Sequence, residues 1–247
     1  MQVIDIRGIF LLSLIPGAIA VLILIFFVKE VVVKRSSSYT PQSIMLSNIK
    51  RAIRGNRPYL LLLIITGVFG MGAFNFPSIL LRASDLGIAE NLIPLIYATI
   101  NVAHTVIGIP SGIFADKIGK EKVLIIGYSV FAISTILMLV LSGNTLYAYV
   151  LAVIFGLYMG ISETVQRAVI PGYVASELRG TAYGLYNLVI GTTFFVANVA
   201  FGFLWDNYGL TAAVSYSVIT AIAAVSGMFM FIRKYPPHNH PAQAILT

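Results

Sequence analysis

Long apolar segments dominate this sequence of 247 residues. Seven of them are long enough to cross the hydrocarbon core of a bilayer, which takes about 20 mainly apolar residues. They cover residues 9–28, 59–81, 92–114, 123–141, 146–170, 181–204 and 211–232. Only 10% of the residues are charged, whereas a soluble domain carries about 25%. The chain is therefore predicted to be an all-α polytopic membrane protein with seven transmembrane helices, and an ordinary soluble fold is excluded.

Basic residues are distributed unevenly between the two sides of the predicted membrane protein. One side receives all but two of the 16 Lys and Arg residues, and the other side receives only Arg7 and Arg82. Cytoplasmic loops are enriched in Lys and Arg, so we expect an outside N-terminus and a cytoplasmic C-terminus in a cell inner or plasma membrane. The net charge of +7 follows from this topology, and no nucleic-acid partner is needed to explain it.

The connection at 29–58 is longer and more basic than the others. The chain is therefore predicted to have four parts: a single transmembrane helix at 1–28, a cytoplasmic linker at 29–58, a six-helix bundle at 59–234 and a cytoplasmic tail at 235–247. Within the linker, Ile49 and Ile53 lie on one side of a possible helix over 43–54, and Lys50 and Arg51 lie largely on the other. This pattern suits an interfacial helix on an anionic leaflet. A solvated basic loop is the alternative.

A motif between the third and fourth spans is the most specific signal in the chain. Its residues are Gly112, Asp116, Lys117, Gly119, Lys120 and Lys122. Gly119 can take the positive φ that a short turn needs, and Gly112 allows close helix approach. Asp116 can accept hydrogen bonds from an exposed helix N-terminus nearby. The lysines can pair with a carboxylate or hold the turn at the lipid headgroups.

A weaker copy of this motif follows 90 residues later, at Gly202, Asp206 and Gly209. Three spans separate the two copies, so the copies lie on opposite faces of the membrane. An inverted repeat of three helices against three helices requires this arrangement. Chance recurrence of a short Gly/Asp pattern is the alternative.

The first motif resembles the loop signature of the major facilitator superfamily. Lys117 stands where that family often has Arg, and Glu121 interrupts the usual basic run. Residues 177–187 are similar to the start of the eleventh helix of bacterial drug-efflux-like members, and residues 9–30 resemble their sixth helix. The resemblance implies that the chain holds helices six to twelve of a twelve-helix transporter and lacks helices one to five.

The resemblance also implies a function, namely a secondary transporter that works by alternating access between two six-helix bundles. We expect export of a small drug-like molecule or metabolite across the bilayer, with the proton as a candidate coupling ion and an N-terminal bundle as the missing partner. A non-transporting partner subunit or a truncated gene product is the alternative. No enzyme is expected, because phosphate-cradling loops, metal-ligand clusters and paired carboxylates do not occur. Accordingly, neither a metal nor a cofactor is predicted.

Glu163 and Arg167 are the only formally charged residues inside the predicted spans. They are spaced i,i+4 near one end of the fifth span and share a helix face. Charge inside a membrane is costly, so these two residues are the leading functional candidates. We expect a cytoplasmic charge gate in which Glu163 pairs with Lys120 or Arg167. A pair that only neutralises itself at a wet helix end is the alternative.

Polar residues elsewhere in the spans are candidate cavity residues. Tyr97, Asn101 and His104 fall at i, i+4 and i+7, so they share one face of the third span. His104 lies about 18 Å along the axis from the motif aspartate, near mid-bilayer. It can couple proton movement or contact substrate, or it can be a neutral histidine bonded to a neighbouring helix. Three asparagines can line the cavity or join helices: Asn75, Asn187 and Asn198.

Overall fold

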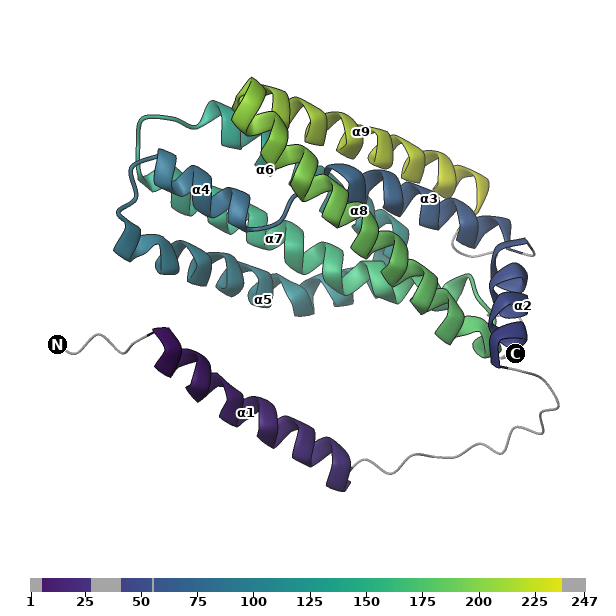
Figure 1. The fold of residues 1–247 in the computed structure, drawn as a ribbon. Coiled ribbons are helices and arrows are strands. Elements are labelled where there is room, and N and C mark those ends of the chain that lie inside the picture. Colours follow the sequence, from purple (N-terminus) through teal and green to yellow (C-terminus); the bar gives the residue numbers. More distant parts are fainter. Residues whose placement is uncertain (1–5, 28–40, 55, 237–247) are drawn as a thin grey trace. The chain divides into compact units, whose positions relative to one another are not determined.

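The computed structural model describes residues 6–27, 41–54 and 56–236, in which all regular secondary structure is helical (Figure 1). The chain divides into two units, residues 1–40 and residues 41–247. In the first unit, α1 (Ile6–Phe27) is a helix of 22 residues that matches the first predicted span. Residues 28–40 and 237–247, which include most of the predicted tail, lie outside the described part.

The second unit contains the bundle. Its α-helices are α2 (Pro41–Arg54), α3 (Arg57–Gly72), α4 (Pro77–Asp85), α5 (Ile93–Ile118), α6 (Lys120–Val140), α7 (Leu146–Val169), α8 (Arg179–Tyr208) and α9 (Leu210–Lys234). Short 3-10 turns occur at Glu90–Leu92, Ile170–Gly172 and Ser176–Leu178. Six helical segments of the described residues are long and apolar enough to cross a membrane. The predicted class, an all-α polytopic membrane protein, is confirmed.

The two copies of the Gly/Asp motif form equivalent turns. Gly119 joins α5 to α6 with φ of +103°, and Gly209 joins α8 to α9 with φ of +83°. Residues with a side chain rarely adopt such angles, so a glycine is needed at both turns. The positive φ predicted for Gly119 is confirmed, and its counterpart 90 residues later behaves in the same way.

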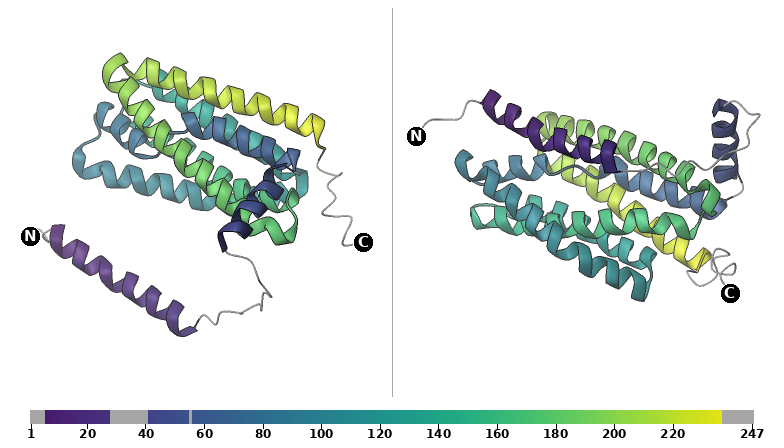
Figure 2. Two further views of the ribbon diagram at one scale, coloured as in Figure 1. Left: turned by 45° about the vertical axis from the view of Figure 1, so that its right-hand side comes forward. Right: turned by 90° about the horizontal axis from the view of Figure 1, so that it is seen from below.

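Helix packing in the bundle follows the order that a repeat of three spans requires. If α3–α4 is exchanged with α7, α5 with α8 and α6 with α9, the strongest contacts between these helices map onto one another. Thus α5 packs on α7 as α8 packs on α3, and α6 packs on α7 as α9 packs on α3. The pair α6 and α9 maps onto itself. Figures 1 and 2 show α9 running alongside α3 and α6. This pattern agrees with the inverted repeat expected from the motif.

The second predicted span, residues 59–81, is interrupted and is not one continuous helix. α3 ends at Gly72, residues 73–76 form an irregular segment, and α4 begins at Pro77. Proline has no N–H to donate to the preceding turn, so Pro77 favours a break at this point and begins α4 as its first residue. The Asn198 side-chain oxygen on α8 accepts the Asn75 N–H at 3.1 Å, and the Asn75 side chain accepts the Phe76 N–H at 2.8 Å. These bonds satisfy backbone groups that the break has exposed.

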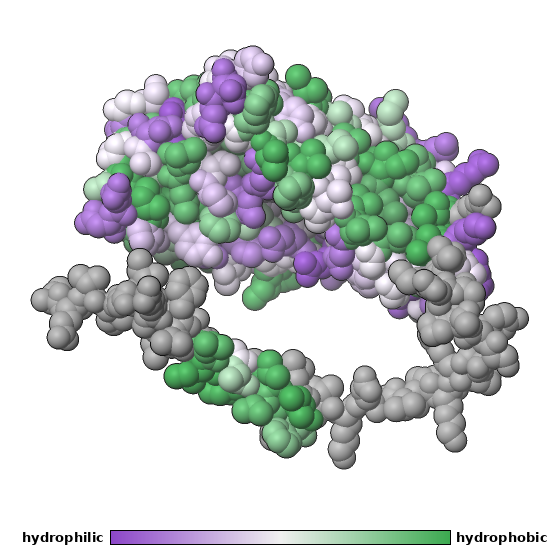
Figure 3. Space-filling view, viewed as in Figure 1, coloured by the Kyte–Doolittle hydropathy of each residue, from purple (hydrophilic) through white to green (hydrophobic). Residues whose placement is uncertain are grey.

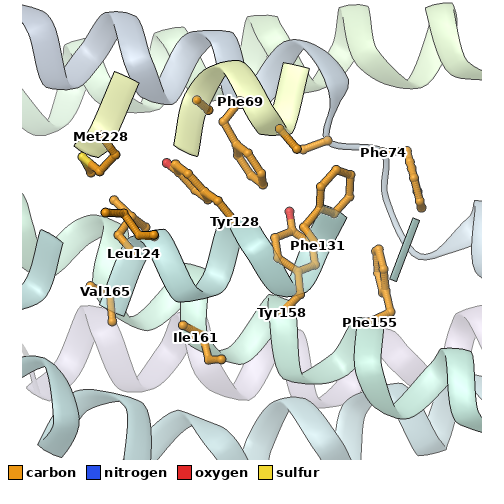
Figure 4. Packing of buried hydrophobic residues seen from close by; sticks show 14 of the residues in the cluster. Phe69, Phe74, Leu124, Tyr128, Phe131, Phe155, Tyr158, Ile161, Val165 and Met228 are labelled. Carbon is orange, nitrogen blue, oxygen red and sulfur yellow. The ribbon is translucent and has the colours of Figure 1, made fainter. Parts of the chain in front are cut away.

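Aromatic rings and close helix contacts form the core. The Phe69 ring of α3 stacks on the Tyr128 ring of α6 at 3.8 Å between centroids, and Phe131 and Tyr158 pack beside them (Figure 4). α7 approaches the backbone of α5 through Gly156. A Cβ on this glycine would lie 2.4 Å from the Ile100 carbonyl oxygen, so only glycine fits there.

The helices of the bundle differ strongly in how much of them is buried. In the most apolar stretches of α5 and α8 only 17% of the residues are buried, against 61% in α3–α4 and 56% in α7. Figure 3 shows patches of hydrophobic residues on one face of the bundle, with hydrophilic residues at its ends and also across its middle. Lipid or further protein must therefore cover the open faces of α5 and α8.

Candidate functional site

A small cavity lies beside the break between α3 and α4. Its volume is about 100 Å³. The lining comes from the break, from α7 and from α8, and comprises Ala73, Phe74, Asn75, Phe155, Tyr158, Met159, Ser162, Glu163, Gln166 and Phe194. Four of the ten lining residues are aromatic, one is a carboxylate, and three others carry uncharged polar side chains. Two predicted site residues, Asn75 and Glu163, therefore lie at one cavity.

Glu163 forms an ion pair that the sequence did not suggest. Its Oε2 lies 3.5 Å from Nε2 of His104, which joins α7 to α5. The two side chains are 56% and 30% exposed within this unit, so the pair lies on the open side of the bundle and not in its core. A proton on the imidazole makes this contact a charged pair, and a neutral imidazole leaves Glu163 without a countercharge.

The partners expected for Glu163 are not at this position. Among the described residues, neither Lys120 nor Arg167 comes within 4 Å of a carboxylate oxygen of Glu163. Arg167 is exposed, and its backbone carbonyl accepts the Tyr183 hydroxyl at 3.2 Å. Helical spacing predicted that the side chains of 163 and 167 share a face. It did not predict that the His104 imidazole on α5 would lie closer to Glu163 than Lys120 or Arg167 does.

The other candidate residues on α5 share its open face, as the spacing predicted. Tyr97 is 43% exposed, and its ring packs against Phe76 at 4.9 Å between centroids. The Asn101 side chain is exposed and donates to the Tyr97 carbonyl of its own helix at 2.8 Å. Asn101 therefore does not join two helices here, whereas Asn198 does, at the break. Asn187 is exposed on α8.

A buried polar network near Glu163 was not predicted from the sequence. Gln166 of α7 donates to the Tyr128 hydroxyl of α6 at 3.2 Å and accepts the Tyr186 hydroxyl of α8 at 2.7 Å. The Ser162 hydroxyl, only 3% exposed, has no hydrogen-bond partner among the described residues. Glutamine and tyrosine carry no formal charge, so a search for charged residues inside spans passes over them. Of these groups, Gln166 and Ser162 line the cavity and give its wall hydrogen-bonding atoms.

The loop motif lies at the end of the bundle where α5 meets α6. Asp116, Lys117 and Lys122 are exposed there. The hydrogen bonds expected between Asp116 and a helix N-terminus are not formed, since no side chain caps the N-terminus of α6 or α8. A Cβ at Gly112 would lie an ordinary 3.8 Å from Thr164, so the close approach expected there is absent. Close approach to α5 occurs instead at two glycines of α7, Gly156 and Gly160.

Glu121, which interrupts the basic run of the motif, has a structural role. It is 6% exposed and accepts the Tyr173 hydroxyl at 2.6 Å. Burial, together with the nearby Glu121 carboxylate, raises the pKa of the Tyr173 phenol, which keeps the phenol protonated as a donor. The Tyr173 carbonyl accepts the Asn56 side-chain N–H. Tyr173 thus ties the start of α3 and the start of α6 to the connection between α7 and α8.

We expect Tyr173→Phe to destabilise the bundle by about 1.5–3 kcal/mol, because a buried carboxylate would lose a hydrogen bond. Chemical denaturation of the purified protein in detergent measures the change. Tyr208→Phe is the matched control, since Tyr208 is 69% exposed, and its effect is expected to stay within about 0.5 kcal/mol. Equal effects of the two substitutions would contradict a stabilising role for the Tyr173 hydroxyl.

Comparison with known proteins gives one family. The family model described as Major Facilitator Superfamily matches residues 62–246. An uncharacterised MFS-type transporter of Methanocaldococcus jannaschii is 26% identical over 216 residues, which are 85% of this chain and 51% of that protein. An uncharacterised protein of Mycobacterium tuberculosis is 23% identical over 170 residues, 69% of this chain and 39% of that protein. The chain thus spans about half the length, or less, of the relatives that it matches.

Proposed function

Because the chain belongs to the major facilitator superfamily, we propose that it supplies the C-terminal bundle of a secondary transporter that moves a small solute by alternating access. The observation that carries this proposal is the cavity beside the broken α3–α4 span. Transporters commonly place substrate sites at discontinuous helices, whose exposed backbone groups can bind polar parts of a ligand. Asn75 at the break, and Tyr97, Asn101 and His104 on the open face of α5, are the proposed substrate contacts, with Asn187 on α8.

A second bundle is the proposed partner of this one. The open faces of α5 and α8 support this proposal, because both spans are apolar overall and little buried within the unit. The relatives' greater length supports it too, since the matched region of the first is 51% of that protein. In this arrangement α1 is the last helix of the N-terminal bundle, and residues 59–234 are the C-terminal bundle. The two bundles enclose the substrate between them. The cavity of about 100 Å³ is then one part of a larger site between the two bundles. Ligand pockets typically measure about 300–1,000 Å³.

Glu163 is the proposed gating residue, with His104 as its partner in this conformation. The pair joins α5 to α7, so a change in their relative position makes or breaks it. Because a histidine side chain can bind and release a proton, the proton is the proposed coupling ion. Arg167, one turn further along α7, is the proposed alternative partner in another conformation.

The proposed orientation places the basic end of the bundle in the cytoplasm. That end holds Lys117, Lys120 and Lys122 of the motif and the last residues of α9. The abundance of Lys and Arg there supports this orientation. In it, the N-terminus of α1 is outside and the motif lysines hold the turn at the headgroups. Export of a small drug-like molecule or metabolite is the proposed direction.

Transport by the protein in liposomes tests the proposal. The chain is purified from its native membrane together with any segment or subunit that accompanies it, and solutes of positive, negative and zero charge are supplied under a pH gradient. We expect one class of solute to move, at a rate that depends on the gradient. If no class moves and a separate membrane protein co-purifies, the chain is a non-transporting partner and the proposal is wrong.

A further inference from the structure

A second and larger cavity lies away from the proposed substrate site, between α2 and the connection from α7 to α8. Its volume is about 600 Å³. Lys50, Arg51 and Ala52 of α2 line one side, and Val174, Ala175 and Leu178 of the connection line the other. Nothing in the transport proposal uses this cavity.

α2 presents two different faces at this cavity. Lys50 and Arg51 are exposed, whereas Ala52 is 1% exposed and Ile49 and Ile53 are half-buried. α2 packs on α3 and α8, which agrees with the amphipathic helix expected for residues 43–54. The cavity therefore has an apolar floor and a cationic rim.

The cavity lies level with the ends of two membrane-spanning segments. The span that contains α3 begins at Arg57, shortly after α2, and the span that contains α8 begins at Ser176, between the cavity-lining residues Ala175 and Leu178. Span ends mark the boundary between hydrocarbon and headgroups. An occupant of this cavity is thus positioned at the height of the lipid phosphates.

We propose that this cavity binds the phosphate headgroup of an anionic membrane lipid. The Arg51 guanidinium can contact two phosphate oxygens at once, and the Lys50 ammonium adds a second positive charge. The apolar floor formed by Ala52, Val174 and Leu178 suits the glycerol backbone and the first part of an acyl chain. A small soluble phosphate would leave that floor uncovered, which favours the lipid as the source of the phosphate.

One acidic residue opposes this binding. Glu177 lies close enough to Arg51 and Arg179 to interact with their charges. The surrounding charge is still positive, because Lys50, Arg51, Arg57 and Arg179 are all exposed at this end of the bundle. Removal of the Glu177 charge is therefore expected to strengthen lipid binding, whereas loss of Lys50 and Arg51 weakens it.

Native mass spectrometry of the purified full chain in neutral detergent tests the proposal. Phosphatidylglycerol and phosphatidylcholine are offered at equal concentration, and we expect at least fivefold more phosphatidylglycerol to be retained. Lys50→Gln with Arg51→Gln is expected to reduce the ratio to below twofold. Ala175→Phe fills the cavity without a change of charge and is expected to do the same. Glu177→Gln is expected to raise the ratio about twofold.

The matched control is Arg233→Gln with Lys234→Gln, which removes the same charge from exposed residues at the end of α9. It is expected to leave the ratio unchanged, and the melting temperature of each variant is compared with that of the unaltered protein to verify folding. Equal losses in both double variants, or normal lipid retention by a folded Ala175→Phe variant, would overturn the cavity as the binding site.

A competition experiment with glycerol 3-phosphate distinguishes a lipid from a soluble phosphate compound. If glycerol 3-phosphate displaces the lipid at equal concentration, the lipid assignment is overturned and the ligand is a soluble phosphate compound.

Discussion

Glu163→Gln is expected to lower the transport rate at least tenfold while the protein still inserts and folds. The substitution keeps the shape of the side chain and removes its charge. The His104 imidazole then loses its carboxylate partner at 3.5 Å, and the cavity loses the one carboxylate among its lining residues. Because the pair lies on the open side of the bundle, its loss is expected to affect stability little. Uptake into liposomes, with melting temperature measured in parallel, separates the two effects.

Glu90→Gln is the matched control for this experiment. Glu90 is exposed at the connection between α4 and α5, so the same charge is removed away from the cavity and transport is expected to stay within twofold. His104→Gln tests the pairing itself. If the two groups act as one unit, the double variant is expected to transport no more slowly than Glu163→Gln alone. Unchanged transport by Glu163→Gln would refute the gating role.

Gly156→Ala is expected to destabilise the packing of α7 on α5 strongly. Its Cβ would lie 2.4 Å from the Ile100 carbonyl oxygen and 2.8 Å from the Ala103 Cβ. Both atoms belong to α5 and neither is the end of a flexible side chain, so the two helices must move apart. Overpacking of this kind typically costs about 1–3 kcal/mol and occasionally more. The melting temperature in detergent measures the loss.

Gly191→Ala is the matched control for Gly156→Ala. Both glycines lie within long helices, but a Cβ at Gly191 meets nothing within 4 Å. Alanine favours a helix by about 1 kcal/mol over glycine, so an unchanged or higher melting temperature is expected. Gly160→Ala is expected to act like Gly156→Ala, since its Cβ would lie 2.4 Å from the His104 carbonyl oxygen. Equal melting temperatures for the Gly156 and Gly191 variants would contradict the close packing of α5 on α7.

The repeat and its turns were predictable from local chemistry. Gly119 and Gly209 occupy the same place in two motif copies, and both adopt positive φ. Glycine tolerates that conformation without strain, so its position in a short connection is informative by itself. Gly112 shows the limit of this reasoning, because it belongs to the same motif and yet a Cβ there would make only an ordinary contact, at 3.8 Å from Thr164. Whether a helical glycine permits close packing depends on which helix lies opposite.

The candidate site was predictable only in part. Sequence reasoning identified Glu163 as a charged residue within a span, and it placed His104 on one face of its helix. It did not name His104 as a neighbour of Glu163, because helical spacing relates residues of one helix only. The break in the second span was predictable only as a tendency to bend. Glycines and Pro77 allow a break, but the break also uses the Asn198 side chain, 123 residues away in the chain, to accept a backbone N–H.

The amino-acid sequence by itself determined the membrane class, the extents of most spans, the turns between paired helices and the repeat. Each of these follows from local requirements: about 20 apolar residues to cross a bilayer, and glycine where φ is positive. The tertiary structure alone decided which helices touch, and hence that Glu163 meets His104, that Glu121 is buried against Tyr173 and that α7 needs Gly156. Lipid tails are as apolar as the helix surfaces, so hydrophobicity does not select which helices pair in a membrane. Interhelical contacts depend instead on small residues and on single hydrogen bonds between distant parts of the chain.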